Sequence, residues 1–348
     1  MGPVALLSLA TALPPHRLEQ DAVLARAEGL FGPRYPEFRR MAAVFRTSGI
    51  SERRSVVEPG WFDHPHGWPE RNAAFLEGAS ALFVDAATRA LEGCGLTAHE
   101  VDVVVTVTST GIATPGLEAV VAGQMGFRPD IQRVPVFGLG CAGGASGLGI
   151  ATRLAAAQPG KTVLFVAVET CTLSFRLDQL TKANMVATAL FADGAAACVL
   201  RAGDADAPLA VIDGAAEHTW PDTLDVMGWR VDPEGLGVIF AVAIPPFAEA
   251  NVGPAMSAML ADMGADRPDR FICHPGGTKV VQALERTLTL PDGSLDHERA
   301  VLADHGNMSS PTVLFVLERA LAAGVRGRLV PMAMGPGFTC AALSLRVA

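Results

Sequence analysis

The sequence has few cysteines, and none of them form a closely spaced pair. There is no CxxC motif and no His/Cys spacing typical of zinc sites, and the six thiols are scattered at Cys94, Cys141, Cys171, Cys198, Cys273 and Cys340. A disulfide framework or a zinc site needs regularly spaced cysteines. We therefore expect no disulfide and no metal, and we expect a reducing compartment such as the cytoplasm.

Lysine is scarce, and the overall charge is negative. Among 348 residues the formal net charge is −9, and lysine occurs only at Lys161, Lys182 and Lys279. Because contacts to nucleic-acid phosphates need clustered cations, this balance excludes a general nucleic-acid-binding role. Arginine supplies most of the positive charge, and its planar guanidinium suits phosphate contacts, although a GC-rich genome would produce the same bias.

The sequence also contains no hydrophobic run of the kind that spans a membrane. The longest uncharged stretches, residues 134–152 and 329–345, hold too many glycines or prolines for a spanning helix. Residues 4–13 are largely apolar, but no basic region precedes them and two prolines follow, so we predict a first strand and not a signal peptide. We expect a cytoplasmic protein without integral membrane association.

What the sequence does contain is an alternation of helix and strand patterns. Residues 20–43, with an interruption near Gly32-Pro33, and residues 70–93 have helical spacing of apolar residues. The β-branched run at residues 101–109 is typical of a buried parallel strand. Hydrophobic residues make up 50% of the chain, enough to bury one large domain or two ordinary ones. We also predict helices at residues 117–125, 245–263 and 309–323, and a strand at residues 270–273.

Arginines gather in one N-terminal segment of this otherwise acidic chain, at Arg34, Arg39, Arg40, Arg46, Arg53 and Arg54. Most charge clusters of this kind form a solvated face. The functional alternative is a docking surface for an anionic group such as a nucleotide phosphate.

Cys141 lies in a glycine-rich stretch, residues 134–148, where an apolar run meets a helical pattern. This is the form of a tight turn from a strand into a helix. A thiol at a helix N-terminus feels the positive end of the peptide dipoles, which favours the thiolate and therefore nucleophilic chemistry. The alternative is a small buried hydrophobic residue.

A C-terminal pattern repeats the one that follows Cys141. In both places a turn leads into an alanine-rich helix and then a strand: Cys141 stands 20 residues before Lys161, and Asn307 stands 21 before Arg328. Such a repeat predicts a layered α/β fold of two similar halves, which we place at residues 1–210 and 211–348. We expect the site where the halves meet.

Three predicted turns carry the candidate catalytic residues. His274 follows a predicted strand and precedes Pro-Gly-Gly, and Asn307 stands at a helix start. Alone, such a histidine is more often structural, and the asparagine an ordinary cap. Together with Cys141, they suit acyl transfer through a thioester, with imidazole and amide holding an oxyanion or enolate. The GxGxxG match at residues 138–143 lies mid-chain, without the acidic residue that a dinucleotide site requires further on.

At these residues the sequence resembles the type III polyketide synthases, the chalcone synthase-like enzymes of the thiolase superfamily. The motifs are Gly140-Cys141-Ala-Gly-Gly, Ala189-Leu-Phe191-Ala-Asp-Gly-Ala-Ala-Ala, His274-Pro-Gly-Gly and Gly306-Asn307-Met-Ser-Ser, and a fifth, Gly335-Pro336-Gly337, is similar to the family's C-terminal loop. The resemblance implies a thiolase-like duplicated fold with the layers α-β-α-β-α. It also implies a homodimeric acyltransferase that uses acyl-CoA and malonyl-CoA and needs no other cofactor.

The resemblance further implies a role for each matched residue. Cys141 would hold the acyl chain, while His274 and Asn307 would stabilise the enolate formed from malonyl-CoA. Arg40 would contact a CoA phosphate, and Thr114 would cross the dimer interface into the partner's site. The implied substrate-binding residues are the gatekeepers Phe191 and Phe240, the cavity residues Thr110, Thr114, Cys171, Ser174 and Ser309, and the loop of Gly335, Pro336 and Gly337.

The departures from the family pattern concern the starter. Cys340 follows the C-terminal loop where many members carry an acidic residue, and Thr114 and Cys171 differ from many plant members. Because several lining residues are small, we expect a fatty acyl starter and an alkylpyrone or alkylresorcinol product. Two alternatives remain. One is a ketoacyl synthase III-type enzyme, which normally carries Gln-Ala-Asn after its histidine, and the other is a non-catalytic thiolase-fold binding subunit.

Overall fold

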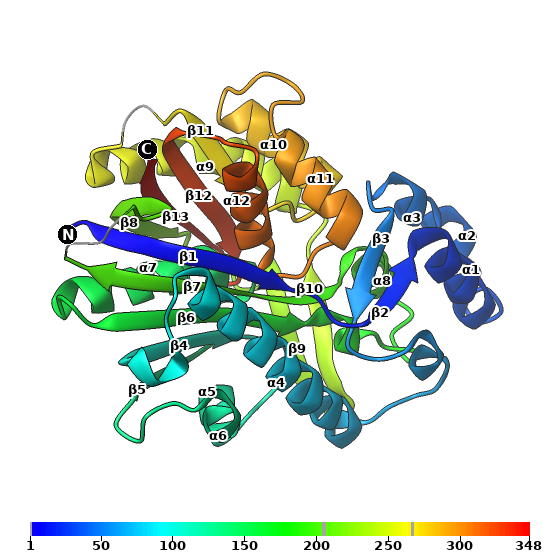
Figure 1. Cartoon of the computed structure of the whole chain (residues 1–348). Coiled ribbons are helices and arrows are strands. Elements are labelled where there is room, and N and C mark those ends of the chain that lie inside the picture. The colour runs from blue at the N-terminus through cyan, green and yellow to red at the C-terminus, as the bar shows by residue number, and fades with distance from the viewer. Residues whose placement is uncertain (1, 204–206, 266–267) are drawn as a thin grey trace.

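One large β-sheet dominates the architecture (Figure 1). The computed structural model describes residues 2–203, 207–265 and 268–348, and within these ranges nine strands join in the order β11-β12-β13-β8-β1-β7-β6-β4-β5. They are β1 (Val4–Ala12), β4 (Val103–Thr108), β5 (Gln132–Phe137), β6 (Thr162–Thr170), β7 (Asp193–Ala202), β8 (Ala210–Thr219), β11 (Arg270–Cys273), β12 (Gly327–Gly335) and β13 (Thr339–Val347). The predicted first strand, β1, is central because it pairs with β7 on one side and β8 on the other.

The sheet consists of two halves with the same strand order and directions. In the N-terminal half, β1 pairs antiparallel with β7, β7 antiparallel with β6, and β6 parallel with β4. In the C-terminal half, β8, β13, β12 and β11 repeat this series of antiparallel, antiparallel and parallel pairings. The predicted duplication is therefore confirmed. The boundary between residues 210 and 211 stays a prediction.

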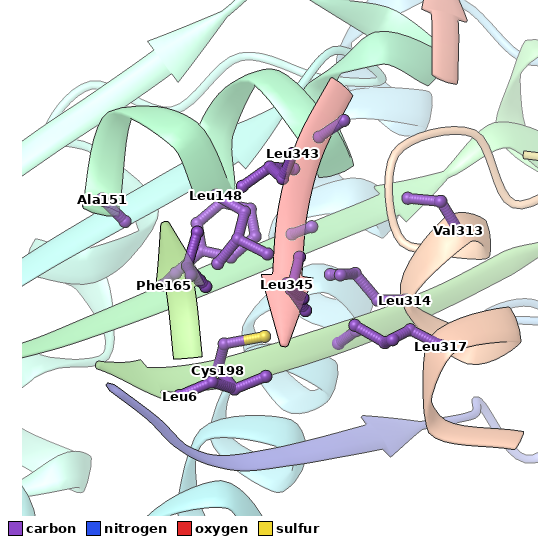
Figure 2. Close-up of a cluster of buried hydrophobic side chains, with 14 of the residues drawn as sticks. Leu6, Leu148, Ala151, Phe165, Cys198, Val313, Leu314, Leu317, Leu343 and Leu345 are labelled. Atoms are coloured by element: carbon purple, nitrogen blue, oxygen red, sulfur yellow. The ribbon is translucent and has the colours of Figure 1, made fainter. Parts of the chain in front are cut away.

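Two helices lie between the halves. The helices α7 (Gly143–Ala157) and α12 (Thr312–Ala322) precede the equivalent strands β6 and β12, and they pack against each other. Figure 2 shows Leu148 of α7 and Leu314 of α12 in one buried cluster with Phe165 of β6. Strands alternate the faces of their side chains, so these helices bury one face of each half.

Other helices cover the outer faces. On β6, Leu164 and Val166 flank the inward-facing Phe165 and point the other way, where they pack with α4 (Trp68–Gly93). The outer face of the C-terminal half packs with α9 (Ile244–Met263) and α10 (Thr278–Thr287). The layers therefore follow the predicted order α-β-α-β-α. In the described ranges, no helix combines the length and apolar character needed to cross a membrane.

A small N-terminal subdomain, residues 16–55, lies at one side of the sheet (Figure 1). It consists of β2 (His16–Glu19), α1 (Gln20–Phe31), α2 (Phe38–Met41), α3 (Ala43–Thr47) and β3 (Glu52–Ser55). The predicted interruption near Gly32-Pro33 is present: α1 ends at Phe31 because Pro33 follows closely and lacks the N–H that a continuing helix would use. The apolar residues of the three helices bury a separate cluster against α8 (Lys182–Leu190).

The remaining elements are short. They are α5 (Leu117–Val120), α6 (Ala122–Met125), β9 (Met227–Asp232), β10 (Gly235–Phe240), α11 (Asp296–His305) and the 3-10 helices η1 (Pro59–Asp63), η2 (Ala98–Glu100), η3 (Gly140–Ala142) and η4 (Cys171–Ser174). The helix predicted at residues 117–125 is divided at Val121, whose φ of −89° and ψ of −2° depart from ideal helical values. The strands β9 and β10 form a separate antiparallel pair.

One member of the arginine cluster does not lie on a solvated face. Arg53, on β3, is only 1% exposed, and its Nη2 donates to the carbonyl of Thr188 at 2.7 Å. The prediction of a solvated face is therefore wrong for Arg53. The reason is strand alternation, because every second residue of β3 points inward from the β2–β3 pair.

Gly144 allows α7 to pack against the turn before α12. A β-carbon here would overlap the carbonyl oxygen of Ser310 and lie 2.6 Å from Cγ1 of Val313. We expect Gly144→Ala to lower the free energy of unfolding by about 2 kcal/mol or more, because a central helix must shift. Gly123→Ala, in α6 with open space around it, should be neutral or slightly stabilising. Urea unfolding compares the two variants, and equal losses would contradict this account.

Candidate active site

Cys141 lies in a tight turn between β5 and α7. The turn contains η3, which directly precedes the helix, and Gly138 and Gly140 have φ angles of 93° and 49°. Such angles favour glycine. The N–H of Gly140 donates to the hydroxyl of Ser109, after β4, at 3.0 Å. The predicted strand-to-helix turn is therefore present and tied to the neighbouring strand.

A loop from the C-terminal half lies against this turn. Gly335, at the end of β12, approaches the turn so closely that a β-carbon would overlap its backbone. Pro336 packs on Gly140, with its Cδ 2.6 Å from the place that a β-carbon of residue 140 would occupy. Gly337 continues the loop with a φ of 117°. The predicted loop of Gly335, Pro336 and Gly337 thus lies beside Cys141.

The Cys141 turn lies against the other two predicted turns. The side chain of Ser309 lies near enough to the Cys141 thiol to lower the thiol's pKa, and a β-carbon on Gly143 would lie 3.1 Å from Cβ of Ser310. Oδ1 of Asn307 accepts from the N–H of Ser309 at 2.8 Å, and its Nδ2 donates to the carbonyl of Gly276 at 3.2 Å. Gly276 lies two residues after His274. The structure therefore gathers the thiol, imidazole and amide turns in one place.

His274 is held by its backbone but not by its ring. Its N–H, just after β11, donates to the carbonyl of Met332 at 2.9 Å. The ring is buried, and neither Nδ1 nor Nε2 has a hydrogen-bond partner among the described residues. The ring is therefore not bonded to the Cys141 thiol in this structure. Because an unpartnered buried polar group is costly, this ring is suited to accept or donate a hydrogen bond when a substrate is bound.

Burial dominates the ionisation of both groups. It raises the pKa of the Cys141 thiol to about 12 and lowers the pKa of His274 to about 4. The lowered thiol pKa that a helix N-terminus predicts is therefore outweighed by the loss of water around the sulfur. If the Cys141 proton passed to the ring of His274, thiolate and imidazolium would form together, and the opposite charges would then stabilise each other.

We expect joint ionisation to appear in the pH dependence of alkylation. Iodoacetamide should modify Cys141 of the wild-type protein at a nearly constant rate from about pH 6 to 9, because His274 accepts the proton. In His274→Ala, only the burial-raised thiol pKa of about 12 remains. The rate at neutral pH should then fall at least about 100-fold and rise about tenfold per pH unit.

The half-buried Cys94, at the end of α4, provides the internal reference for this experiment. Its alkylation rate should be the same in both proteins, since it lies outside the site. Mass spectrometry of the modified peptides measures both thiols in one sample. The same pH profile for Cys141 with and without His274 would rule out joint ionisation.

A buried carboxylate that sequence reasoning missed also lies at the site. Oε2 of Glu169, on β6, accepts from the N–H of Ser109 and the hydroxyl of Thr110, both at 2.8 Å, and its Oε1 accepts from the hydroxyl of Ser310 at 3.1 Å. Burial raises the pKa of Glu169 to about 7 despite these donors. The carboxyl group thereby joins β4, β6 and the turn before α12. The signal was an acidic residue within a buried strand pattern.

An apolar cavity of about 310 Å³ lies between the N-terminal subdomain and α8. Of the predicted cavity residues, Cys171, Ser174 and Phe191 line it, whereas Thr110, Thr114 and Ser309 do not. Burial raises the pKa of Cys171 well above its usual value, and nearby carboxylates add to the rise. The cavity lies next to the Asn307 turn, because Phe191 on its wall forms a bridge with Asn307.

Phe191 stands between this cavity and the Asn307 turn. It forms a short parallel bridge with Asn307, and its ring meets that of Trp229 edge-on, with centroids 6.0 Å apart. Trp229 belongs to the β9–β10 pair and was not predicted as a site residue. Phe240, on the same pair, packs with the cluster beneath α9 and does not line the cavity. Its gatekeeper role stays a prediction.

Two predicted binding residues lie on the surface. Thr114 is exposed in the loop after β4, on the edge of the molecule where Ile112, Val120 and Phe137 also expose large apolar side chains. Arg40 is exposed on α2. Their roles toward a partner subunit and toward CoA stay predictions.

Comparisons with known proteins cover both halves. Residues 68–204 match the family model described as chalcone and stilbene synthases, N-terminal domain, and residues 212–348 match the corresponding C-terminal domain. A 1,3,6,8-tetrahydroxynaphthalene synthase of Streptomyces peucetius is 38% identical, over 97% of this chain and 91% of its own length. The polyketide synthase-like Pks18 of Mycobacterium tuberculosis, named for alpha-pyrone synthesis, is 32% identical over 95% and 88%.

The solved structures agree. The crystal structure of 1,3,6,8-tetrahydroxynaphthalene synthase from Streptomyces coelicolor superimposes with a TM-score of 0.92, at 26% identity over 99% of both chains. Fold and relatives together define an acyltransferase with a thiolase-like fold. Within that class, the chain belongs to the chalcone and stilbene synthase family, the type III polyketide synthases. The resemblance noted from the sequence motifs is confirmed.

Proposed function

We propose that this type III polyketide synthase condenses an acyl-CoA starter iteratively with malonyl-CoA, using Cys141, His274 and Asn307. The observation that supports this most is the close approach of the three turns: a β-carbon on Gly143 would lie 3.1 Å from Cβ of Ser310, and Asn307 bonds both the N–H of Ser309 and the carbonyl of Gly276. It assembles a nucleophile, a base and an amide donor from both halves of the fold.

In the loading step, the thiol of Cys141 attacks the carbonyl of the starter thioester. Its proton passes to His274, and CoA leaves as a thiol that takes up this proton. The acyl chain is then held as a thioester on Cys141. Because a lone thiolate is disfavoured by burial, His274 must accept the proton as the sulfur attacks.

In the extension step, malonyl-CoA loses carbon dioxide, and the electron pair of the broken bond forms a thioester enolate. The enolate oxygen accepts hydrogen bonds from the ring of His274 and the amide of Asn307, which uses one N–H for Gly276 and retains a second. The enolate carbon attacks the acyl thioester, so a carbon–carbon bond forms and the Cys141 sulfur is released. The cycle uses only CoA thioesters and no further cofactor.

The starter class follows from the cavity. Its walls beside Cys171 and Phe191 are mostly apolar, which suits an aliphatic acyl chain and a pyrone or resorcinol product with an alkyl tail. Incubation with malonyl-CoA and saturated acyl-CoAs of graded length, with products identified by mass spectrometry, tests this. We expect medium or long chains to be extended most efficiently, and turnover of only short or aromatic starters would overturn it.

A homodimer fits the exposed apolar edge that carries Ile112, Val120, Phe137 and Thr114. Covering this edge with a second copy would remove apolar surface from water and bring Thr114 toward the partner's site.

The relatives also disfavour a ketoacyl synthase III-type enzyme, and Pro-Gly-Gly after His274 agrees with them. We place the enzyme in the cytoplasm.

A further inference from the structure

Arg53 is a buried cation with unused donors. Its Nη2 binds the carbonyl of Thr188, but Nε and Nη1, both buried, have no hydrogen-bond partner among the described residues. The other two buried arginines in these ranges differ: Arg71 binds three backbone carbonyls, and Arg176 binds two aspartates. Two unsatisfied N–H groups on a buried guanidinium are costly, so the site is built to receive an acceptor.

The nearest protein carboxylate does not fill this place. Asp193 lies near enough to favour the charged form of Arg53, which keeps a pKa of about 10 despite burial. Its oxygens, however, accept from the N–H of Val56 at 2.8 Å and from the N–H and hydroxyl of Thr172 at 2.7 and 2.6 Å. The described residues provide no ion pair to Arg53. The guanidinium is thus charged, with only one of its nitrogens bonded.

Arg53 lines the same apolar cavity as Cys171 and Phe191. It also lies beside the Asn307 turn, because a β-carbon on Gly306 would be 3.3 Å from its Cβ. The other charged lining residues are already paired, Arg17 with Glu19 and Glu52 and Arg26 with Asp63, so Arg53 is the cation of the described lining that has no ion pair. A plain alkyl chain would satisfy the walls and leave the buried guanidinium without a partner.

We propose that this cavity binds an aliphatic chain ending in a carboxylate, and that Arg53 recognises that carboxylate. A guanidinium presents parallel N–H donors that match a carboxylate in geometry and charge. The proposal deepens the proposed function and rests on it: the starter class becomes an ω-carboxyacyl thioester, with its thioester end at Cys141 and its carboxylate at Arg53. Arg53 is then a specificity-determining residue of the starter site.

The first test uses the wild-type enzyme with malonyl-CoA and two matched starters, decanoyl-CoA and the ω-carboxylated sebacoyl-CoA. We expect kcat/KM for sebacoyl-CoA to be higher by about tenfold or more, as a charge-assisted hydrogen bond would give. Equal turnover, or a preference for decanoyl-CoA, overturns the role of Arg53 and leaves the proposed function intact. If the enzyme converts neither starter, the fatty acyl version of the proposed function is contradicted. The binding test then decides whether Arg53 recognises a carboxylate.

The binding test needs no turnover. Calorimetric titration compares decanoate with decanamide, which has the same length but no charge, and we expect decanoate to bind about tenfold more tightly or better. This preference should disappear in Arg53→Met. It should be weakened in Arg53→Lys, which keeps the positive charge but lacks the parallel N–H donors of a guanidinium. Arg54→Gln, which changes the neighbouring arginine of β3 that does not line the cavity, is the matched control and should retain it. Equal binding of the two ligands by the wild-type protein contradicts the proposal, whether or not the Arg53 variants fold.

Discussion

Cys141→Ala should abolish condensation, with product formation from an acyl-CoA and malonyl-CoA falling at least about 1,000-fold. The proposed mechanism has no route around the missing sulfur, because the acyl chain must be held while the enolate forms. Intact-protein mass spectrometry should detect an acyl adduct on the wild-type protein and none on the variant. Product formation is measured on the same samples.

Cys171→Ala and Cys94→Ala separate the nucleophile from its neighbours. Cys171 is buried and lines the cavity, so its replacement should alter starter preference but leave the acyl adduct intact. Cys94 lies outside the site and should have no effect. An acyl adduct that persists in Cys141→Ala and disappears in Cys171→Ala would transfer the nucleophilic role to the neighbour.

Elements with a strong local pattern could be predicted from the sequence. The strand at residues 270–273 is β11, and the helix predicted at residues 245–263 is α9, which begins one residue earlier. The turns at Cys141 and Asn307 could also be predicted as equivalent, because glycines and a following helical pattern mark both. Their meeting could only be inferred, since it depends on α7 and α12 packing between the two halves of the sheet.

The buried charges could not be predicted in the same way. Arg53 stands among exposed arginines in the sequence, and charged side chains are seldom buried, so composition favours a solvated face. Its burial results from the pairing of β2 with β3 and the packing of that pair on α8, which are tertiary contacts. Glu169 could have been noticed within its apolar strand, but its partners come from two distant segments. The raised thiol pKa likewise depends on burial and not on the local turn.

Asn307→Ala should separate the two half-reactions of the enzyme. Malonyl-CoA decarboxylation should fall by about 100-fold or more, since one donor to the developing enolate oxygen is removed, whereas starter loading on Cys141 should fall less than about tenfold. Decarboxylation is followed by release of carbon dioxide from labelled malonyl-CoA, and loading by the acyl adduct on the protein. Some loss of loading is expected because Oδ1 of Asn307 also accepts from the N–H of Ser309, whose side chain lies near enough to the thiol to lower its pKa.

Asn307→Asp distinguishes donation from positioning. The aspartate keeps the shape and the acceptor for the N–H of Ser309 but cannot donate as a carboxylate, and its charge opposes an enolate. Loading should therefore be retained better than in Asn307→Ala, while decarboxylation stays as low or falls further. Asn251→Ala, which removes a side-chain bond within α9 far along the chain from the three turns, should leave both half-reactions unchanged. If Asn307→Asp decarboxylates malonyl-CoA at the wild-type rate, Asn307 positions Ser309 and the thiol, and the enolate must be held by His274 alone.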